Sequence, residues 1–250
     1  MAAMFALWLL SLAKRNASIV DIWWGPGFLL LGCTALIAAP GPVEARSRLI
    51  VALTALWGLR LGGYLMWRNW GEGEDSRYVA MRRHFGERFP WISLFTVFAL
   101  QGVLQWTVAL PVQLTAAAGG PPLWTALDVM GVALFAVGLG FETIGDAQLA
   151  RFKADPANRG RVMDQGLWRY TRHPNYFGDF CVWWGLGAIA LSVPGAAWTL
   201  IGPLVMSVLL LRVSGVALLE RTIGRRRPAY ADYVERTSAF FPRPPRRSAS

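Results

Sequence analysis

A long, mainly apolar segment from Leu123 to Ala150 has the sequence LWTALDVMGVALFAVGLGFETIGDAQLA. A helix needs about 20 mainly apolar residues to cross the hydrocarbon core of a bilayer, and this segment is long enough. Its last third carries two acids, Glu142 and Asp146, four positions apart. The segment therefore predicts a membrane-crossing helix with a polar end.

Six further segments have the same character. They cover approximately residues 1–13, 18–39, 48–69, 91–115, 175–193 and 196–219. The first segment is short, but no charged region precedes it and no small-residue cleavage site follows it, so we expect a short or tilted helix rather than a signal peptide. Uncharged turns at residues 119–122 and 192–195 join helices four to five and six to seven. The expected fold is all-α, an integral membrane bundle of about seven transmembrane helices that form one domain over residues 1–241.

Composition supports a membrane protein. The 250 residues are 54% hydrophobic and only 16% charged, whereas soluble domains carry about 25% charge. The two cysteines, Cys33 and Cys181, lie far apart in apolar runs. This spacing argues against a disulfide framework and against a metal site.

The net charge of +10 is unevenly distributed. Basic residues cluster after helix one, between helices three and four, between five and six, and after seven, while the other connections hold only Arg46 and Arg48. This alternation is the positive-inside pattern and places the C-terminus in the cytoplasm. Because the basic residues are divided among membrane-flanking loops, we expect no nucleic-acid partner. Residues 242–250 have the composition of a disordered basic tail.

Ionisable residues in a spanning helix cost about 2.5–3.5 kcal/mol each, so they are functional candidates. Residues four apart share one helix face. Polar residues with this spacing, or near the cytoplasmic end of a predicted helix, are Asp21, Arg60, Tyr64, Arg68, Glu142, Asp146, Asn175, Asp179, Arg212 and Glu220. They predict a polar cavity that opens to the cytosol. The alternative is a set of interhelical ion pairs that only fix packing.

The surrounding arginines suit a phosphorylated cofactor, because guanidinium groups bind phosphates. The chain has neither a GxGxxG motif after a strand nor a GxxxxGK[ST] motif, so a Rossmann fold and a P-loop are excluded. Gly138-Leu139-Gly140 lies inside a predicted helix, where small residues favour close helix packing.

The most distinctive motif runs from Gly166 to Gly187, with the sequence GLWRYTRHPNYFGDFCVWWGLG. A basic, aromatic loop leads directly into a predicted spanning helix. Pro174 suits the first turn of that helix because its missing N–H would be unpaired there. His173, one of two histidines in the chain, precedes it.

This motif and three others resemble the membrane steroid 5-alpha-reductase superfamily, most closely its bacterial branch of uncharacterised, reductase-like members. The others are Phe141-Glu142-x-x-x-Asp146, Glu74-Asp75-x-Arg77-Tyr78 and Arg226-Arg227-Pro228-x-Tyr230-x-x-Tyr233. The resemblance covers about residues 18–242. The Arg-His-Pro-x-Tyr segment alone is less specific, because isoprenylcysteine carboxyl methyltransferases share it.

The resemblance implies an oxidoreductase of the bacterial inner membrane that acts on CH–CH groups. Such an enzyme would hold NADPH in a cytosolic cavity and reduce an activated, enone-type double bond of a lipophilic, steroid-like or lipid substrate. The positions that match the family's cofactor-binding residues are Arg60, Tyr64, Asp146, Arg161, Asn175 and Asp179. The further cofactor-binding candidates are Glu142, which shares a helix face with Asp146, and three residues of the basic, aromatic loop before Pro174, namely Tyr170, Arg172 and His173. Arg172 and His173 stand where the steroid-reducing members have small residues.

Reduction of an enone also needs a proton or hydrogen-bond donor at the carbonyl oxygen, where each donor supplies on the order of 3–4 kcal/mol. The resemblance implies a glutamate on helix two and a tyrosine on helix three for this role. Asp21 is the catalytic candidate on helix two, and Trp57 occupies the expected tyrosine position. The alternative is that Asp21 pairs with an arginine and only anchors helix two.

Two other functions are open at this point. The first is an S-adenosylmethionine-dependent membrane methyltransferase of a lipophilic acceptor, although a sulfonium cofactor without phosphates suits an arginine-rich cavity poorly. The second is a non-enzymatic scaffold or lipid-binding protein, which would not require the polar residues to converge. Trp23 and Trp24 fit either a flat apolar substrate pocket or anchors at the membrane interface.

Overall fold

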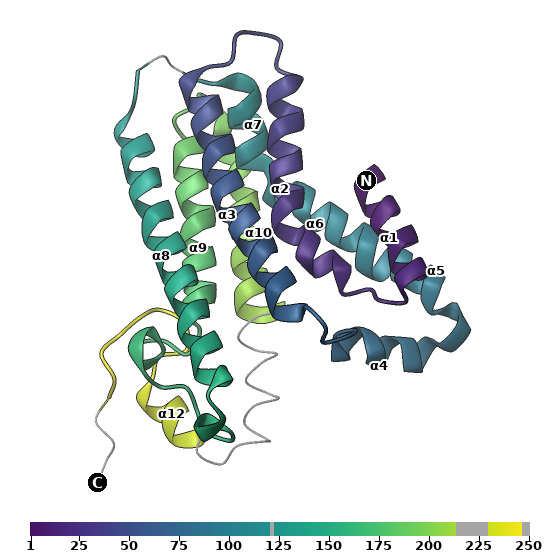
Figure 1. The fold of residues 1–250 in the computed structure, drawn as a ribbon. Helices are drawn as coiled ribbons and strands as arrows, with labels where there is room; N and C mark the ends of the chain where they lie inside the picture. The colour runs from purple at the N-terminus through teal and green to yellow at the C-terminus, as the bar shows by residue number, and fades with distance from the viewer. Residues whose placement is uncertain (121–122, 214–229, 247–250) are drawn as a thin grey trace. The chain divides into compact units, whose positions relative to one another are not determined.

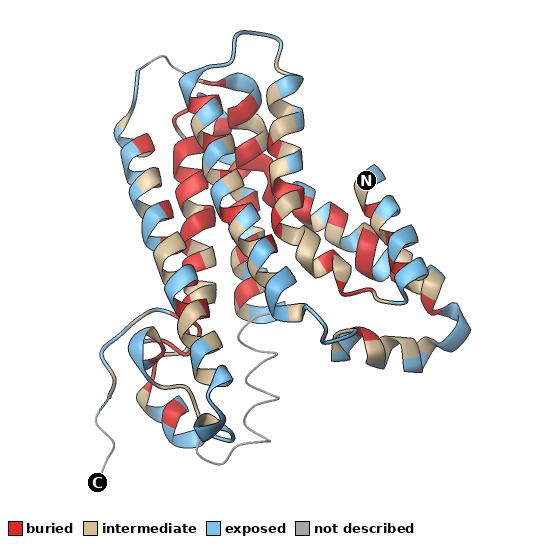
Figure 2. Ribbon diagram, in the orientation of Figure 1, coloured by how far each residue is buried: buried red, intermediate tan, exposed pale blue. Residues whose placement is uncertain are grey.

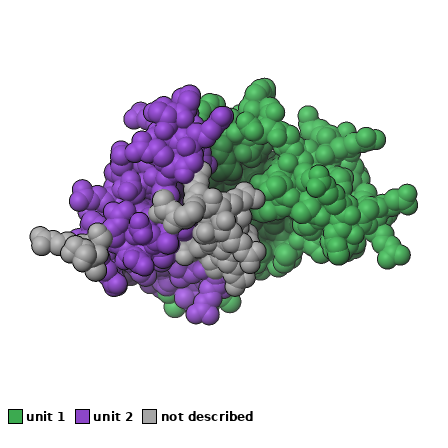
Figure 3. All heavy atoms as spheres, turned by 90° about the horizontal axis from the view of Figure 1, so that it is seen from below, with its two compact units in different colours: residues 1–123, 193–201 green, residues 124–192, 202–250 purple. Residues whose placement is uncertain are grey.

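The computed structural model describes residues 1–120, 123–213 and 230–246, and in these ranges it contains helices and connecting segments but no strand. The chain forms two compact units (Figure 3). The first unit comprises residues 1–123 and 193–201, and the second comprises residues 124–192 and 202–250. The expectation of one domain over residues 1–241 stays a prediction.

In its described residues, the first unit contains helices and short helical turns that are joined by connecting segments (Figure 1). They are α1 (Ala2–Lys14), α2 (Ile19–Ile37), α3 (Ala45–Asn69), α4 (Ser76–Phe85), η1 (Gly86–Arg88), α5 (Phe89–Ser93), η2 (Leu94–Ala99), α6 (Leu100–Val108), α7 (Leu110–Ala118) and η5 (Ala196–Leu200). The backbones of α2 and α3 approach so closely at Gly25 and Gly58 that a Cβ on either glycine would overlap the carbonyl of the other. One turn along α3, Gly62 packs against the ring of Pro26.

The fourth predicted helix differs from its expected range of 91–115. A continuous helical path already begins at Ser76, and it breaks at Ala109 before α7. Pro111 explains the break, because proline has no N–H to continue the hydrogen-bond ladder and its ring clashes with the preceding turn. The arginine-rich stretch of α4 gave no apolar signal, which is why the sequence placed the start of this helix later.

The second unit is built around a pair of long helices, α8 (Ala126–Ala154) and α9 (Pro174–Ala190), which lie side by side (Figure 1). Its other elements are η3 (Pro156–Asn158), η4 (Gly166–Arg169), α10 (Ile201–Val208), η6 (Leu209–Val213) and α12 (Tyr230–Arg236). From Cys181 to Ala190, α9 is buried at every residue except Trp184, which is intermediate (Figure 2).

Glycines bring α8 and α9 into backbone contact. A Cβ on Gly138 would lie 2.5 Å from the carbonyl oxygen of Gly178, and a Cβ on Gly131 would lie 2.6 Å from that of Gly185. Gly145 packs against Pro174 at the next position along α8. The predicted packing role of the Gly138 segment is therefore confirmed at Gly138, whereas Gly140 faces open space.

Among the described residues, five helical segments are long and apolar enough to cross a membrane. They are Ile19–Ile37, Ala45–Asn69, Ser76–Val108, Ala126–Ala154 and Ala196–Val213. The first helix, α1, is shorter, as expected, and α9 has 17 residues. The membrane-protein class is thus supported, while the count of seven crossings stays a prediction. The end of the seventh predicted helix, with Glu220, lies outside the described residues, as does the Arg226–Pro228 motif.

Candidate functional site

The best-defined cluster of predicted site residues lies where α8 and α9 face each other. The Nδ2 of Asn175 donates a hydrogen bond to Oδ1 of Asp146 across 3.2 Å. Asp146 is buried, and so is Glu142, one turn earlier on α8. Gly178 packs directly against Glu142, and Asp179 is the next residue of α9. The acids of α8 therefore lie against the start of α9, while their role in binding a cofactor stays a prediction.

The start of α9 is fixed by local chemistry. Pro174 occupies the first turn, and His173 precedes it with a buried side chain. The imidazole of His173 stacks on the ring of Tyr176, with ring centroids 5.5 Å apart and planes 10° from parallel. The carbonyl oxygen of Asn175's own side chain accepts from the Tyr176 amide at 3.1 Å. These contacts hold Asn175 in the orientation that reaches Asp146.

Arg172 has a structural partner that the sequence did not indicate. Its Nη1 donates to the carbonyl oxygens of Val234 at 2.9 Å and Thr237 at 2.7 Å. Its backbone amide donates to the carbonyl of Ser238 at 2.9 Å. Arg172 is buried, and these bonds attach the segment that follows α12 to the loop before α9. Its predicted role in binding a cofactor stays a prediction.

The segment from Thr237 to Arg246 is attached at several points. Thr171 Oγ1 donates to the carbonyl of Phe240 at 2.7 Å, and the amide of Arg243 donates to the carbonyl of Tyr170 at 2.9 Å. The expectation of disorder from Pro242 is therefore wrong for residues 242–246, where backbone bonds order the chain. Nothing in their side-chain composition indicates these bonds.

The two other predicted residues of this loop are exposed. Tyr170 exposes 43% of its surface. Arg161 is exposed and contacts the side-chain oxygen of Asn158 at 3.5 Å. Both side chains are accessible to a ligand, but the described contacts do not connect them to the pair Asp146 and Asn175.

The predicted residues of α2 and α3 belong to the first unit. The guanidinium group of Arg60, four residues before Tyr64, lies 5.4 Å from the centroid of the Tyr64 ring. The guanidinium group of Arg68, four residues after Tyr64, lies 5.9 Å from the same centroid. Trp57, which takes the expected tyrosine position, is fully buried and meets Phe28 edge-on at 5.6 Å. Arg60, Tyr64 and Arg68 therefore form a local cation–π cluster on α3. A cavity shared with the α8 and α9 residues stays a prediction.

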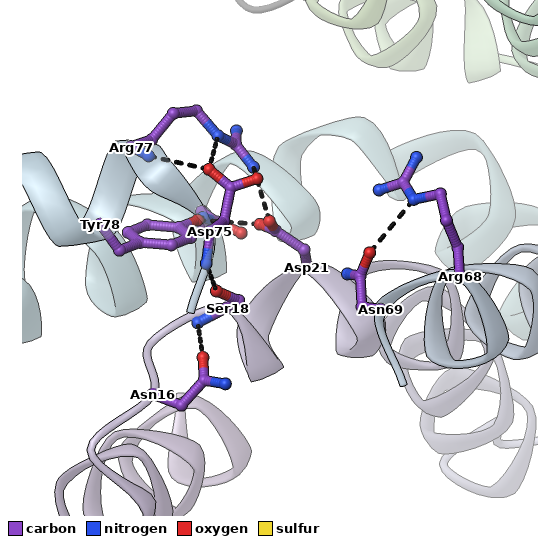
Figure 4. A network of polar contacts seen from close by, with 9 residues as sticks. Asn16, Ser18, Asp21, Arg68, Asn69, Asp75, Arg77 and Tyr78 are labelled. Carbon is purple, nitrogen blue, oxygen red and sulfur yellow. Dashed lines mark hydrogen bonds and ion pairs between the residues drawn. The ribbon is translucent and has the colours of Figure 1, made fainter. Parts of the chain in front are cut away.

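Asp21 is held by two groups of α4 (Figure 4). Its Oδ2 accepts from Arg77 Nη2 at 2.7 Å, and its Oδ1 accepts from the hydroxyl of Tyr78 at 2.8 Å. Arg77 also binds Asp75 at 2.9 Å. This arrangement matches the alternative in which Asp21 pairs with an arginine and anchors α2. Tyr78 is the phenol that meets the helix-two acid, although it lies on α4 and not on helix three.

A second acid joins the same elements nearby. Glu74 accepts from Arg82 at 2.9 and 3.0 Å and from the backbone amide of Ala17 at 2.7 Å. Burial raises the pKa of Glu74, but the hydrogen bonds from Arg82 and Ala17 together bring it below its usual value. The Glu74-Asp75-x-Arg77-Tyr78 motif is thus a docking segment that fastens α4 to the start of α2. Within the described ranges, no group of three or more His, Cys, Asp or Glu side chains is arranged to hold a metal ion.

The fold and these contacts define a helical protein with bilayer-length apolar helices and a hydrogen-bonded pair between a buried acid of α8 and a half-buried amide at the start of α9. The chain belongs to the family described as "Protein of unknown function (DUF1295)", whose model matches residues 7–237. That family includes steroid 5-alpha-reductase-like membrane proteins.

One curated protein also shows a partial similarity. A segment of 66 residues is 38% identical to the probable O-methyltransferase ustE of Ustilaginoidea virens. The match covers 26% of this chain and 23% of that protein, so it spans less than a quarter of the relative's length. No solved structure matches the chain.

Proposed function

We propose that this protein is a membrane reductase that uses NADPH to reduce an activated, enone-type carbon–carbon double bond in a lipophilic substrate. The observation that carries the proposal is the hydrogen bond from Asn175 to the buried Asp146. The resemblance to the steroid reductases assigns cofactor binding to an acid late in helix five and an Asn-x-x-x-acid pair that opens helix six. In this chain those two elements are α8 and α9, and the assigned side chains meet.

The donors and acceptors of this pair fit the polar groups of a nicotinamide nucleotide. One N–H of the Asn175 amide is used by Asp146, and among the described residues the second N–H has no acceptor. The side chain of Asn175 is only half-buried, so a ligand can reach it. A carboxylate accepts from ribose hydroxyls or a carboxamide N–H, and an amide N–H donates to a carbonyl or hydroxyl oxygen.

NADPH would supply the hydride when bound, and the protein would bind and orient the reactants. Asp146 and Asn175 would fix the cofactor by complementary hydrogen bonds, and the stack of His173 on Tyr176 keeps the start of α9 rigid beside them. Asp21 stays the catalytic candidate that the resemblance gives, and it would have to take up a proton before it could donate one, because both of its carboxyl oxygens accept hydrogen bonds here. Its bonds to Arg77 and Tyr78 hold the carboxyl group in one orientation.

Binding measurements on three variants test the site. Asp146→Ala, Asn175→Ala and Asp179→Ala should each weaken NADPH binding about tenfold or more, because each leaves polar partners unpaired inside the protein at a cost of about 1–3 kcal/mol. Asp232→Ala removes an exposed acid of α12 and should leave the affinity unchanged. Unchanged affinity in all three site variants would reject the site.

Ligand-dependent thermal stability of the detergent-purified chain tests the cofactor. A ligand at 100 times its dissociation constant adds about 2.7 kcal/mol to the stability of the folded state. We expect a higher melting temperature with NADPH, a smaller shift with NADH and none with S-adenosylmethionine. The substrate would then be sought by following NADPH oxidation with enones of sterol, fatty and polyprenyl type.

The match to a probable O-methyltransferase favours a second candidate function, methyl transfer from S-adenosylmethionine to a lipophilic acceptor. The acid–amide pair could also hold the ribose of that cofactor. Stabilisation by S-adenosylmethionine and not by NADPH would select this second function. Stabilisation by neither would leave both enzyme proposals without support.

A further inference from the structure

The second unit contains a hollow that is lined by arginines, and neither Asp146 nor Asn175 is among its lining residues. Its volume is about 530 Å³. We name it the arginine cleft, and its lining residues are Asp164, Gln165, Gly166, Arg169, Arg236, Thr237, Pro245 and Arg246. An adjoining hollow of about 280 Å³ shares Arg236, Thr237 and Arg246 and adds Arg243 and Glu235.

The walls of the arginine cleft are fixed by backbone bonds. One wall is the loop around η4 and the other is the segment that ends at Arg246. The amide of Arg246 donates to the carbonyl of Arg236 at 2.9 Å, and Thr237 contacts the carbonyl of Arg169 through its hydroxyl at 3.5 Å. The bonds of Arg172 to Val234 and Thr237 hold the same two segments together. The arginines therefore project from a folded frame.

The charge of the cleft is positive. Three arginines and one acid line the main hollow, and that acid, Asp164, approaches Arg236 only at 3.7 Å. In the described part of the chain, the side chains of Arg169 and Arg246 make no hydrogen bond or ion pair. Arginines that are not neutralised by the protein repel one another, and an anion between them removes that repulsion. Guanidinium groups bind phosphate oxygens through paired N–H donors.

We propose that the arginine cleft is a phosphate-binding site. The chemistry fits a phosphate group of a membrane lipid or a free phosphate, because both offer the same oxygens. The connection between α8 and α9 follows an apolar helix of bilayer length, α8, so the test includes a lipid headgroup as a source of the phosphate. The proposal is independent of the identity of the enzyme's cofactor.

The test uses the full chain in detergent and two probes, inorganic phosphate and short-chain phosphatidic acid, with short-chain phosphatidylcholine as the neutral-headgroup comparison. Ionic strength is held constant with chloride, because screening alone changes the affinity for an anion. The test variant is Arg169→Gln with Arg246→Gln, which removes two cleft charges without breaking a described side-chain bond. The control is Arg151→Gln with Arg159→Gln, which removes the same charge from exposed positions of the same unit.

We expect at least one phosphate probe to bind and its dissociation constant to rise about tenfold or more in the cleft variant but not in the control. Tighter binding of phosphatidic acid than of inorganic phosphate assigns the site to a lipid headgroup, and the reverse order assigns it to a free phosphate. Either order supports the proposal. Absence of binding by both probes, or an equal loss in the control variant, would overturn it.

Discussion

Both units pack their central helices through close contacts at glycines, but these contacts extend over different lengths of helix. In the first unit, α2 and α3 make backbone contact at Gly25 and Gly58 and then at Gly62 against Pro26. In the second, α8 and α9 meet at a ladder of glycines spaced by seven residues along α8, from Gly131 to Gly145. The closest glycine contacts of the first pair therefore lie within about one turn of α3, whereas those of the second pair recur over about four turns of α8.

The two units also differ in the partners that their acids bind. In the first unit, Asp21 and Glu74 bind arginines and fasten α4 to the start of α2. In the second, Asp146 meets a neutral amide of the facing helix. The acids of the first unit thus fasten one element to another, whereas the acid–amide pair joins the two helices whose motifs match the cofactor-binding positions of the steroid reductases. For this reason we propose the cofactor site on α8 and α9.

The largest expected effect is on the glycine ladder. Gly138→Ala would place a Cβ 2.5 Å from the carbonyl oxygen of Gly178 and 2.6 Å from the amide nitrogen of Val182. Backbone atoms cannot move aside as a flexible side chain can, so the helices must separate. We expect a loss of about 3 kcal/mol or more in the free energy of unfolding, at the upper end of overpacking effects.

Gly140→Ala is the matched control, because a Cβ there meets nothing within 4 Å. It should be neutral or stabilise the helix by up to about 1 kcal/mol. Unfolding midpoints of both variants in the same detergent provide the measurement. If the two substitutions have equal effects, the helices do not pack through Gly138.

The next effect concerns the attachment of the C-terminal segment. Arg172→Met keeps an apolar stem but removes the donor to the carbonyls of Val234 and Thr237. Hydrogen bonds to charged groups contribute about 1.5–3 kcal/mol, so we expect a loss of that order. Amide hydrogen exchange of residues 230–246 should accelerate more than that of α8. Unchanged exchange in this segment would show that Arg172 does not hold it.

Asp21→Asn separates the two interpretations of Asp21. The amide can still accept from the Tyr78 hydroxyl but loses the charge that attracts Arg77, so the anchor interpretation predicts a loss of about 1 kcal/mol in stability. The proton-donor interpretation predicts in addition a loss of turnover with an unchanged dissociation constant for NADPH. Arg77→Gln is the control, because it should reproduce the stability loss alone. Equal losses of turnover in both variants would argue against proton donation by Asp21.

These contacts show what could be predicted from the sequence. The meeting of Asp146 with Asn175 followed from residues four apart sharing a helix face, and Gly138 followed from the preference for small residues where helices touch. The partner of Arg172 could not be predicted, because it is a pair of backbone carbonyls, and every residue has one. The partner of Asp21 could not be chosen among 25 basic residues by charge alone. The break at Pro111 was available in the sequence, but apolar character alone does not locate it.

The smallest expected effect is a pH dependence of stability that arises from Glu74, which is paired with Arg82. The pKa of Glu74 lies below its usual value of 4.5 in the folded protein. The unfolded chain therefore takes up a proton at Glu74 before the folded protein does, and Glu74 contributes stability above pH 4.5. This contribution is lost as pH falls from the unfolded value through the lower folded pKa.

The Arg82 side chain is about one-third exposed, so solvent screens the pair and we expect no more than about 1 kcal/mol. Glu74→Gln should lower stability at pH 6, and its effect should shrink as pH falls below 4.5, where the wild-type carboxyl group loses its advantage. Unfolding free energies at several pH values measure the difference between the two proteins. Glu72→Gln, at an exposed position two residues earlier, should show no such difference at any of these pH values. A constant difference between wild type and Glu74→Gln from pH 6 to pH 3 would mean that the bonds of Glu74 do not depend on its charge.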